Sequence, residues 1–146
     1  MSSQTNFPEA IIIHTAEFEG DVSAETIDEW HKENGWSKIG YHYVVRKNGA
    51  IENGRDELKK GAHCLAGGMN DSSIGICVSG HGDKEAFTNE QITSISALCV
   101  SIMRRYSIEL SEIRGHRYYD SNRSCPGELV DMGELRSNIC NFNNSP

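Results

Sequence analysis

Two histidines and one cysteine are the residues of this chain whose types suit a metal centre. His14 directly follows the apolar run 11–13, and Cys125 lies nine residues after His116 and just before Pro126-Gly127. Zinc binds imidazole nitrogen and thiolate sulfur in tetrahedral geometry, and a site with three protein ligands leaves the fourth position for water. Because the metal makes that water acidic enough to ionise near neutral pH, such a site is typical of hydrolases.

The same three residues also allow a simpler interpretation. A single histidine in a globular protein is more often a surface or hydrogen-bonded residue than a ligand, and a lone cysteine is more often a small buried hydrophobic side chain. The spacing alone does not require the three to converge. A structural zinc site is a third possibility, but such sites usually have four protein ligands, and no fourth candidate lies close to these three in the sequence.

The segments around these residues alternate between strand and helix patterns. The β-branched run 11–13 is typical of a strand buried on both faces, so His14 should lie at its carboxyl end. A last strand, expected over 108–114, should deliver His116. The other expected elements are a helix from Ser23 to Gly35, a hairpin of strands 41–46 and 50–52 around Asn48-Gly49, a strand over 73–78, a long helix that begins at the capping box of Thr88 and Gln91, and a helix over about 130–140.

This order of elements predicts an α/β fold. We expect a mixed central β-sheet flanked by helices, with the metal site at the ends of strands. The 146 residues are sufficient for one compact core and too few for two. The chain is therefore expected to form a single domain over 1–146, with its core at about 10–140.

The composition excludes several classes of protein. No apolar run approaches the ~18 to 20 residues needed to cross a bilayer, and the first basic residue, Lys32, comes too late for a secretory signal. The net charge of −7, from 14 Lys and Arg against 21 Asp and Glu, argues against a nucleic-acid partner. Five cysteines without a Cys-x-x-Cys pair fit neither a secreted disulfide framework nor a zinc ribbon. We therefore expect a cytoplasmic monomer with no membrane partner.

Three segments resemble the type 2 N-acetylmuramoyl-L-alanine amidases, a superfamily that includes short phage lysozymes of the amidase kind and animal peptidoglycan recognition proteins. The segments are Gly40-Tyr41-His42-Tyr43, Asn70-Asp71-Ser72-Ser73-Ile74-Gly75-Ile76, and Gly115-His116-Arg117 with Cys125-Pro126-Gly127. They follow in family order, and the match runs from about residue 11 to residue 139. The resemblance implies that His14, His116 and Cys125 bind one zinc ion. It also implies cleavage of the amide between N-acetylmuramic acid and L-alanine in peptidoglycan.

The resemblance assigns roles to four further residues. Tyr41 matches the tyrosine that phage lysozymes place beside the metal, where a phenol can stabilise an oxyanion or relay a proton, although it could be a strand aromatic. Arg123 stands where related amidases carry Lys, and its permanent charge suits electrostatic stabilisation better than proton transfer. A solvated loop charge is the alternative for Arg123. His63 and Asn70 are candidate substrate contacts, and His63 could equally be an ordinary loop histidine.

Cys77 departs from one branch of this superfamily. Amidases that recycle muropeptides in the cytosol have a glutamate at this position. This chain has a cysteine instead, so it has no carboxylate base there. We therefore expect a phage or prophage endolysin that waits in the cytoplasm until it is released to the cell wall, where peptidoglycan is its partner. The alternatives are a recycling amidase and a receptor that binds peptidoglycan without cleaving it. Loss of ligands marks such receptors, and this chain keeps both histidines and the cysteine.

The other histidines have weaker assignments. By strand alternation, His42 should point to the face opposite Tyr41, where its role would be structural or would support a ligand. His31 and His81 are expected on the surface.

Overall fold

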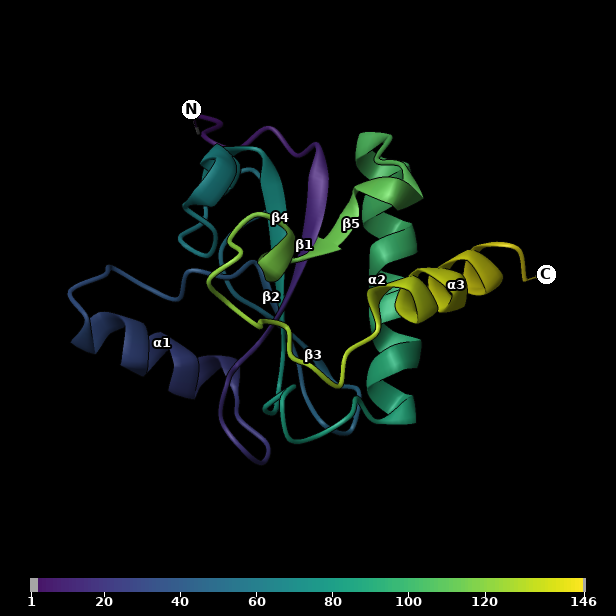
Figure 1. The fold of residues 1–146 in the computed structure, drawn as a ribbon. Coiled ribbons are helices and arrows are strands. Elements are labelled where there is room, and N and C mark those ends of the chain that lie inside the picture. Colours follow the sequence, from purple (N-terminus) through teal and green to yellow (C-terminus); the bar gives the residue numbers. More distant parts are fainter. Residues whose placement is uncertain (1–2, 146) are drawn as a thin grey trace.

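A five-stranded mixed sheet forms the centre of the computed structural model, which describes residues 3–145 (Figure 1). The strands are β1 (Ala10–Thr15), β2 (Tyr43–Val45), β3 (Ile51–Asn53), β4 (Ser73–Val78) and β5 (Ile113–Gly115). Their order in the sheet is β3-β2-β4-β1-β5, and every neighbouring pair is parallel except β2 with β3. The predicted α/β fold is confirmed. Of the expected domain 1–146, residues 1–2 and 146 lie outside the described part.

The two central strands are buried along their whole length. β1 and β4 have no exposed residue, as the apolar run 11–13 predicts for strands covered on both faces. Their register pairs Ile13 with Ile76 and His14 with Cys77. Because side chains alternate along a strand, Ile13 and Ile76 pack into the larger hydrophobic cluster, and His14 and Cys77 point to the opposite face.

Helices cover the two faces of the sheet unequally. The long helix α2 (Asn89–Tyr106) and the last helix α3 (Met132–Asn143) pack together over the larger cluster, and α1 (Ala24–Glu33) lies on the other side (Figure 1). The predicted capping box is present at the start of α2, where the Thr88 side chain accepts from the backbone of Gln91 and the Gln91 side chain accepts from the backbone of Thr88. Over residues 3–145, no helix combines the length and the apolar character that crossing a bilayer requires.

Two predicted strands are shorter in the structure. The strand expected over 41–46 begins only at Tyr43, and the one expected over 108–114 is reduced to β5. In the second case α2 ends at Tyr106 and is capped by Ser107, whose φ of 56° lies in the left-handed region, and the 3₁₀ helix η2 (Leu110–Glu112) follows. β5 nevertheless ends directly before His116, as the sequence predicts.

Candidate active site

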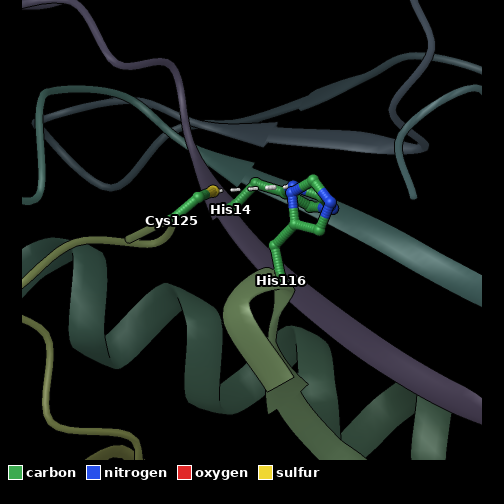
Figure 2. A group of neighbouring side chains, drawn as sticks. All are labelled: His14, His116 and Cys125. Atoms are coloured by element: carbon green, nitrogen blue, oxygen red, sulfur yellow. Dashed lines mark hydrogen bonds between the residues drawn. The ribbon is translucent and has the colours of Figure 1, made fainter. Parts of the chain in front are cut away.

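His14, His116 and Cys125 converge at one edge of the sheet. The three side chains are buried, and their ligand atoms all lie within 4.8 Å of one another. His14 is on β1 near its carboxyl end, His116 is the first residue after the neighbouring parallel strand β5, and Cys125 is in the loop that follows. Figure 2 shows the three side chains pointing toward one another from these separate elements. The sequence prediction that they come together is confirmed.

The geometry of this cluster fits a zinc ion. Nδ1 of His14 lies 3.7 Å from Sγ of Cys125. When a nitrogen and a sulfur share one tetrahedral zinc, bond lengths near 2.1 and 2.3 Å place them about 3.6 Å apart. The spacing of these two atoms is therefore that of two ligands on one zinc ion, and two imidazoles with one thiolate are a ligand set that zinc prefers.

Hydrogen bonds hold the cysteine loop against β1. Oγ1 of Thr15, the residue after His14, donates to the carbonyl of Pro126, the residue after Cys125, at 3.0 Å. The backbone N–H of Arg117 donates to the carbonyl of Cys125 at 2.8 Å, and its guanidinium donates to the carbonyl of Gly127 at 2.6 Å. These contacts fix Cys125 relative to both histidines through the protein alone.

Burial sets the protonation of the ligands. It lowers the pKa of His14 well below its usual value, and the neighbouring His63 and His116 lower it further. Burial also lowers the pKa of His116, with a contribution from the Arg123 charge. Both imidazoles are therefore neutral near neutral pH, which is the form that binds a metal. Burial raises the pKa of the Cys125 thiol to about 12, so this ligand must lose a proton when a metal binds.

An open cleft of about 740 Å³ contains the cluster. Its volume is within the range of roughly 300 to 1,000 Å³ that is typical of ligand sites. All four of the other residues singled out from the sequence line it, namely Tyr41, His63, Asn70 and Arg123. The sequence-predicted residues thus lie around one cavity, although they come from separate loops and strands.

Tyr41 lies beside His14. Its ring centroid is 5.1 Å from that of His14, and the side chain is partly buried against the smaller hydrophobic cluster next to Cys77. Burial and the Cys77 thiol raise the pKa of Tyr41 well above its usual value. The phenol is therefore neutral at physiological pH and keeps a proton with which it can donate a hydrogen bond.

Arg123 lies at the rim of the cleft and is paired with an acid. Its Nε donates to Oδ2 of Asp120 at 3.2 Å, and about half of its side chain is exposed, at 53%. Asp120 also lines the cleft. The contact orients the guanidinium at the mouth of the cavity, where a positive charge acts on His14 and His116.

The polar side-chain atoms of His63 and Asn70 form hydrogen bonds within the protein. Nδ1 of His63 lies 2.9 Å from Nε2 of His14, and Nε2 of His63 lies 3.3 Å from Oγ of Ser73. Oδ1 of Asn70 accepts from the backbone N–H groups of His63 and Cys64, both at 2.8 Å. Both residues line the cleft, as expected for substrate contacts, but these hydrogen bonds give each of them a partner within the protein. Substrate contact stays a prediction for both.

The comparison with known protein families decides the assignment. The N-acetylmuramoyl-L-alanine amidase family model matches residues 4–128, most of the chain. The chain belongs to this amidase family. The family that the sequence motifs resemble is therefore confirmed, and its shared segments include all three residues of the cluster.

Individual relatives of this amidase agree with the family match. The endolysin of Enterobacteria phage T3 is 37% identical over 125 residues, which cover 81% of this chain and 80% of the relative. The endolysin of Escherichia phage T7 is 34% identical over 130 residues, or 84% and 83% of the two chains. The solved structure of the N-acetylmuramoyl-L-alanine amidase LysC from Clostridium intestinale URNW is similar at a TM-score of 0.86 with 33% identity, covering 94% and 89% of the two chains.

Several residues of the amidase cleft have no clear signal in the sequence. His31, expected on the surface, forms an aromatic wall with Trp36 and Tyr41, with ring centroids 4.6 and 5.6 Å apart. Glu17 also lines the cleft, and its φ of 55° lies in the left-handed region that few residues other than glycine adopt. An aromatic in a loop, such as Trp36 directly after Gly35, is the one feature of this group that could have suggested a binding surface.

His42 and Tyr41 do not lie on opposite faces, as strand alternation predicted. Both approach His63, with ring centroids 5.7 and 6.4 Å from its ring. Alternation fails at Tyr41, which precedes β2 and packs with Val44 in the smaller cluster instead of with Tyr43 in the larger one. Nδ1 of His42 accepts from the backbone N–H of Gly75 at 3.0 Å, and Nε2 donates to the carbonyl of Lys59 at 2.9 Å. Its contacts are those of a structural residue.

Proposed function

We propose that this protein is a zinc-dependent hydrolase that cleaves the amide bond between N-acetylmuramic acid and L-alanine in peptidoglycan. The observation that carries the proposal is the convergence of His14, His116 and Cys125 within 4.8 Å, in the cleft of a chain that belongs to the amidase family. His14, His116 and Cys125 would hold the zinc ion, which would supply a Lewis acid for the scissile carbonyl and an acidified water as the source of the nucleophile. The protein contributes a rigid set of ligands and a cleft that holds the substrate over them.

Tyr41 stabilises the charge that develops on the substrate. Attack on an amide carbonyl places a negative charge on its oxygen, and a hydrogen-bond donor aimed at that oxygen lowers the barrier. The phenol of Tyr41 is a neutral donor next to His14 in the cleft. It also holds a proton that the leaving amine needs when the bond breaks.

Arg123 acts on the same reaction through its charge. The guanidinium is at the cleft with its Nε bound to Asp120, which leaves its other N–H groups for an oxyanion or for a carboxylate of the stem peptide. It does not act as an acid, because arginine stays protonated at any physiological pH. His63 and Asn70 line the cleft where the substrate would bind.

We further infer that the protein serves a phage or prophage as an endolysin. The relatives with this name are similar over most of their length, and the described residues include no helix that could cross a membrane. In this role a monomer remains in the cytoplasm until the host membrane opens, and then reaches the cell wall. A cytosolic recycling amidase would act instead on soluble muropeptides.

Incubation with purified sacculi tests the function. The soluble products are analysed by mass spectrometry with and without a chelator. Release of stem peptides that begin with L-alanine, abolished by the chelator and restored by zinc, is the expected result. Intact sacculi that retain the bound, zinc-loaded protein would favour a receptor, and cleavage of soluble muropeptides alone would favour a recycling enzyme.

A further inference from the structure

We propose that His63 is a positioning residue that fixes the proton of His14 on Nε2, and so directs the lone pair of Nδ1 to the metal. The inference rests on the proposed zinc site. His63 lies behind His14 as seen from Cys125, since Nε2 of His14 is 2.9 Å from Nδ1 of His63, while Nδ1 of His14 is 3.7 Å from Sγ of Cys125 (Figure 2 shows the second of these contacts). Each nitrogen of the His14 ring thus has its own partner.

A backbone carbonyl sets the direction of every proton in this chain of contacts. The carbonyl of Met69 can only accept, and it accepts from Oγ of Ser73 at 2.7 Å. A serine hydroxyl has one proton, and we assign it to this shorter contact, so that Oγ of Ser73 accepts from Nε2–H of His63, 3.3 Å away. Nδ1 of His63 is then unprotonated and accepts from Nε2–H of His14. Nδ1 of His14 is left with a lone pair on the side of Cys125.

The fold makes room for an aromatic ring at position 63. A Cβ atom on Gly75 would lie 2.6 Å from Cγ of His63, and one on Gly61 would lie 2.6 Å from Cδ2 of the same ring. Contacts this short are not tolerated, so the ring depends on glycine at both positions. Oδ1 of Asn70 binds the backbone N–H of His63 and fixes the point from which the ring projects. The hydrogen bond from Asn70 and the space left at the two glycines therefore place the His63 ring beside His14.

Loss of this support has a specific consequence for metal binding. Without an acceptor at position 63, the proton of His14 has no partner on that side, and the tautomer with its proton on Nδ1 becomes accessible. That tautomer presents an N–H to the metal position and does not bind zinc. Removing such a partner of a metal-binding histidine typically weakens metal affinity roughly 10- to 100-fold.

Two substitutions at position 63 separate the hydrogen bond from the packing. His63→Leu removes both ring nitrogens, and zinc affinity, measured by competition with a chromophoric chelator, is expected to fall roughly 10- to 100-fold. His63→Asn keeps an oxygen acceptor near the place of Nδ1, so its zinc affinity should lie much closer to that of the unmodified protein. A folded His63→Leu variant with unchanged zinc affinity would overturn the proposal, as would equal losses in the Asn and Leu variants.

His42→Leu is the matched control. His42 is also buried, and its ring nitrogens bind only backbone groups, of Gly75 and Lys59. This variant should lower the thermal stability of the zinc-free protein and leave zinc affinity unchanged. If His42→Leu weakened zinc binding as much as His63→Leu, the effect would come from general loss of packing and the proposal would be wrong.

NMR spectroscopy can determine the tautomers of His14 and His63 directly. Long-range ¹H–¹⁵N correlation spectra of the zinc-free protein should show both His14 and His63 protonated on Nε2, and a proton on Nδ1 of His63 would contradict the inference. Zinc affinity and the histidine tautomers are both measured without peptidoglycan, so neither result depends on its cleavage. If sacculi stay intact but His63→Leu loses zinc, the proposed function fails and the role of His63 stands.

Discussion

Thr15 Oγ1 donates a hydrogen bond of 3.0 Å to the carbonyl of Pro126, and these two residues directly follow the proposed zinc ligands His14 and Cys125. The bond joins the end of β1 to a loop more than a hundred residues later in the chain. It brings the imidazole and the thiol together without a metal, so the cost of ordering the loop does not reduce zinc affinity.

Thr15→Val should weaken both the fold and the site. Valine has the shape of threonine but no donor, so the buried Pro126 carbonyl would lose its partner at a cost of about 1–3 kcal/mol in the free energy of unfolding. Urea unfolding of the zinc-free protein measures this loss, and zinc titration should show weaker binding because the loop is less well held. Thr15→Ser keeps the hydroxyl and is the control, and equal behaviour of Val and Ser would contradict the role given to this bond.

Cys125→Ala should remove metal and activity together. Cys125 is the sulfur of the proposed ligand set, and the remaining two histidines would form an incomplete site. Zinc content by mass spectrometry and release of stem peptides from sacculi are the two measurements. Cys99→Ala is the control, since Cys99 is a buried thiol on α2 within the larger hydrophobic cluster. A Cys125→Ala variant that retained one zinc ion would show that the ligand set is wrong.

Tyr41→Phe should keep zinc and lose rate. The substitution removes only the hydroxyl, so the ligands are untouched, and loss of one donor to an oxyanion typically lowers kcat roughly 10²- to 10³-fold. Tyr43→Phe is a close control, because the Tyr43 hydroxyl binds Glu57 and its ring packs against the cluster under α2. Normal turnover by Tyr41→Phe, measured on sacculi at matched zinc content, would exclude the proposed role of the phenol.

Zinc affinity should rise with pH. The pKa of the Cys125 thiol is raised to about 12, so the zinc-free thiol is protonated and must release its proton on binding. The pKa values of His14 and His116 are lowered, so these ligands are already neutral and do not compete with the metal. We expect affinity to increase roughly tenfold per pH unit between about pH 7 and 9. Chelator competition across this range measures the slope, and a flat profile would mean that no thiolate forms.

The sequence predicts the places of His14 and His116 because each follows a strand pattern, whereas Cys125 lies in a loop and is singled out only by its residue type and the resemblance. The β-branched run before His14 can only be a buried strand, and its carboxyl end must lie at the edge where parallel neighbours also end. The expected strand before His116 is largely replaced by η2, yet its end is correct. The place of each histidine depends on where its strand ends and on the direction of that strand. It depends less on how long the strand is.

The surroundings of the ligands are much harder to predict. His63 lies in a loop that Asn70 holds through its side chain, and the ring depends on a glycine in β4, so its position results from contacts between segments without periodicity. Tyr41 shows the same limit, since β2 begins only at Tyr43 and strand alternation therefore does not place Tyr41 on the correct face. Hydrophobic periodicity places strands and helices, and it gives no information about loops.

The sheet separates the residues that stabilise the fold from the residues that line the cleft. The large apolar cluster under α2 and α3 lies on one face, and the cleft opens on the other beside α1. Rim side chains such as Trp36 and Leu65, which are 42% and 85% exposed, can therefore be randomised in libraries that leave the packing under α2 untouched. The chain is suited to directed evolution toward other cell-wall peptides. Substitutions that strongly lower stability would fall mostly on the opposite face of the sheet, which such libraries do not mutate.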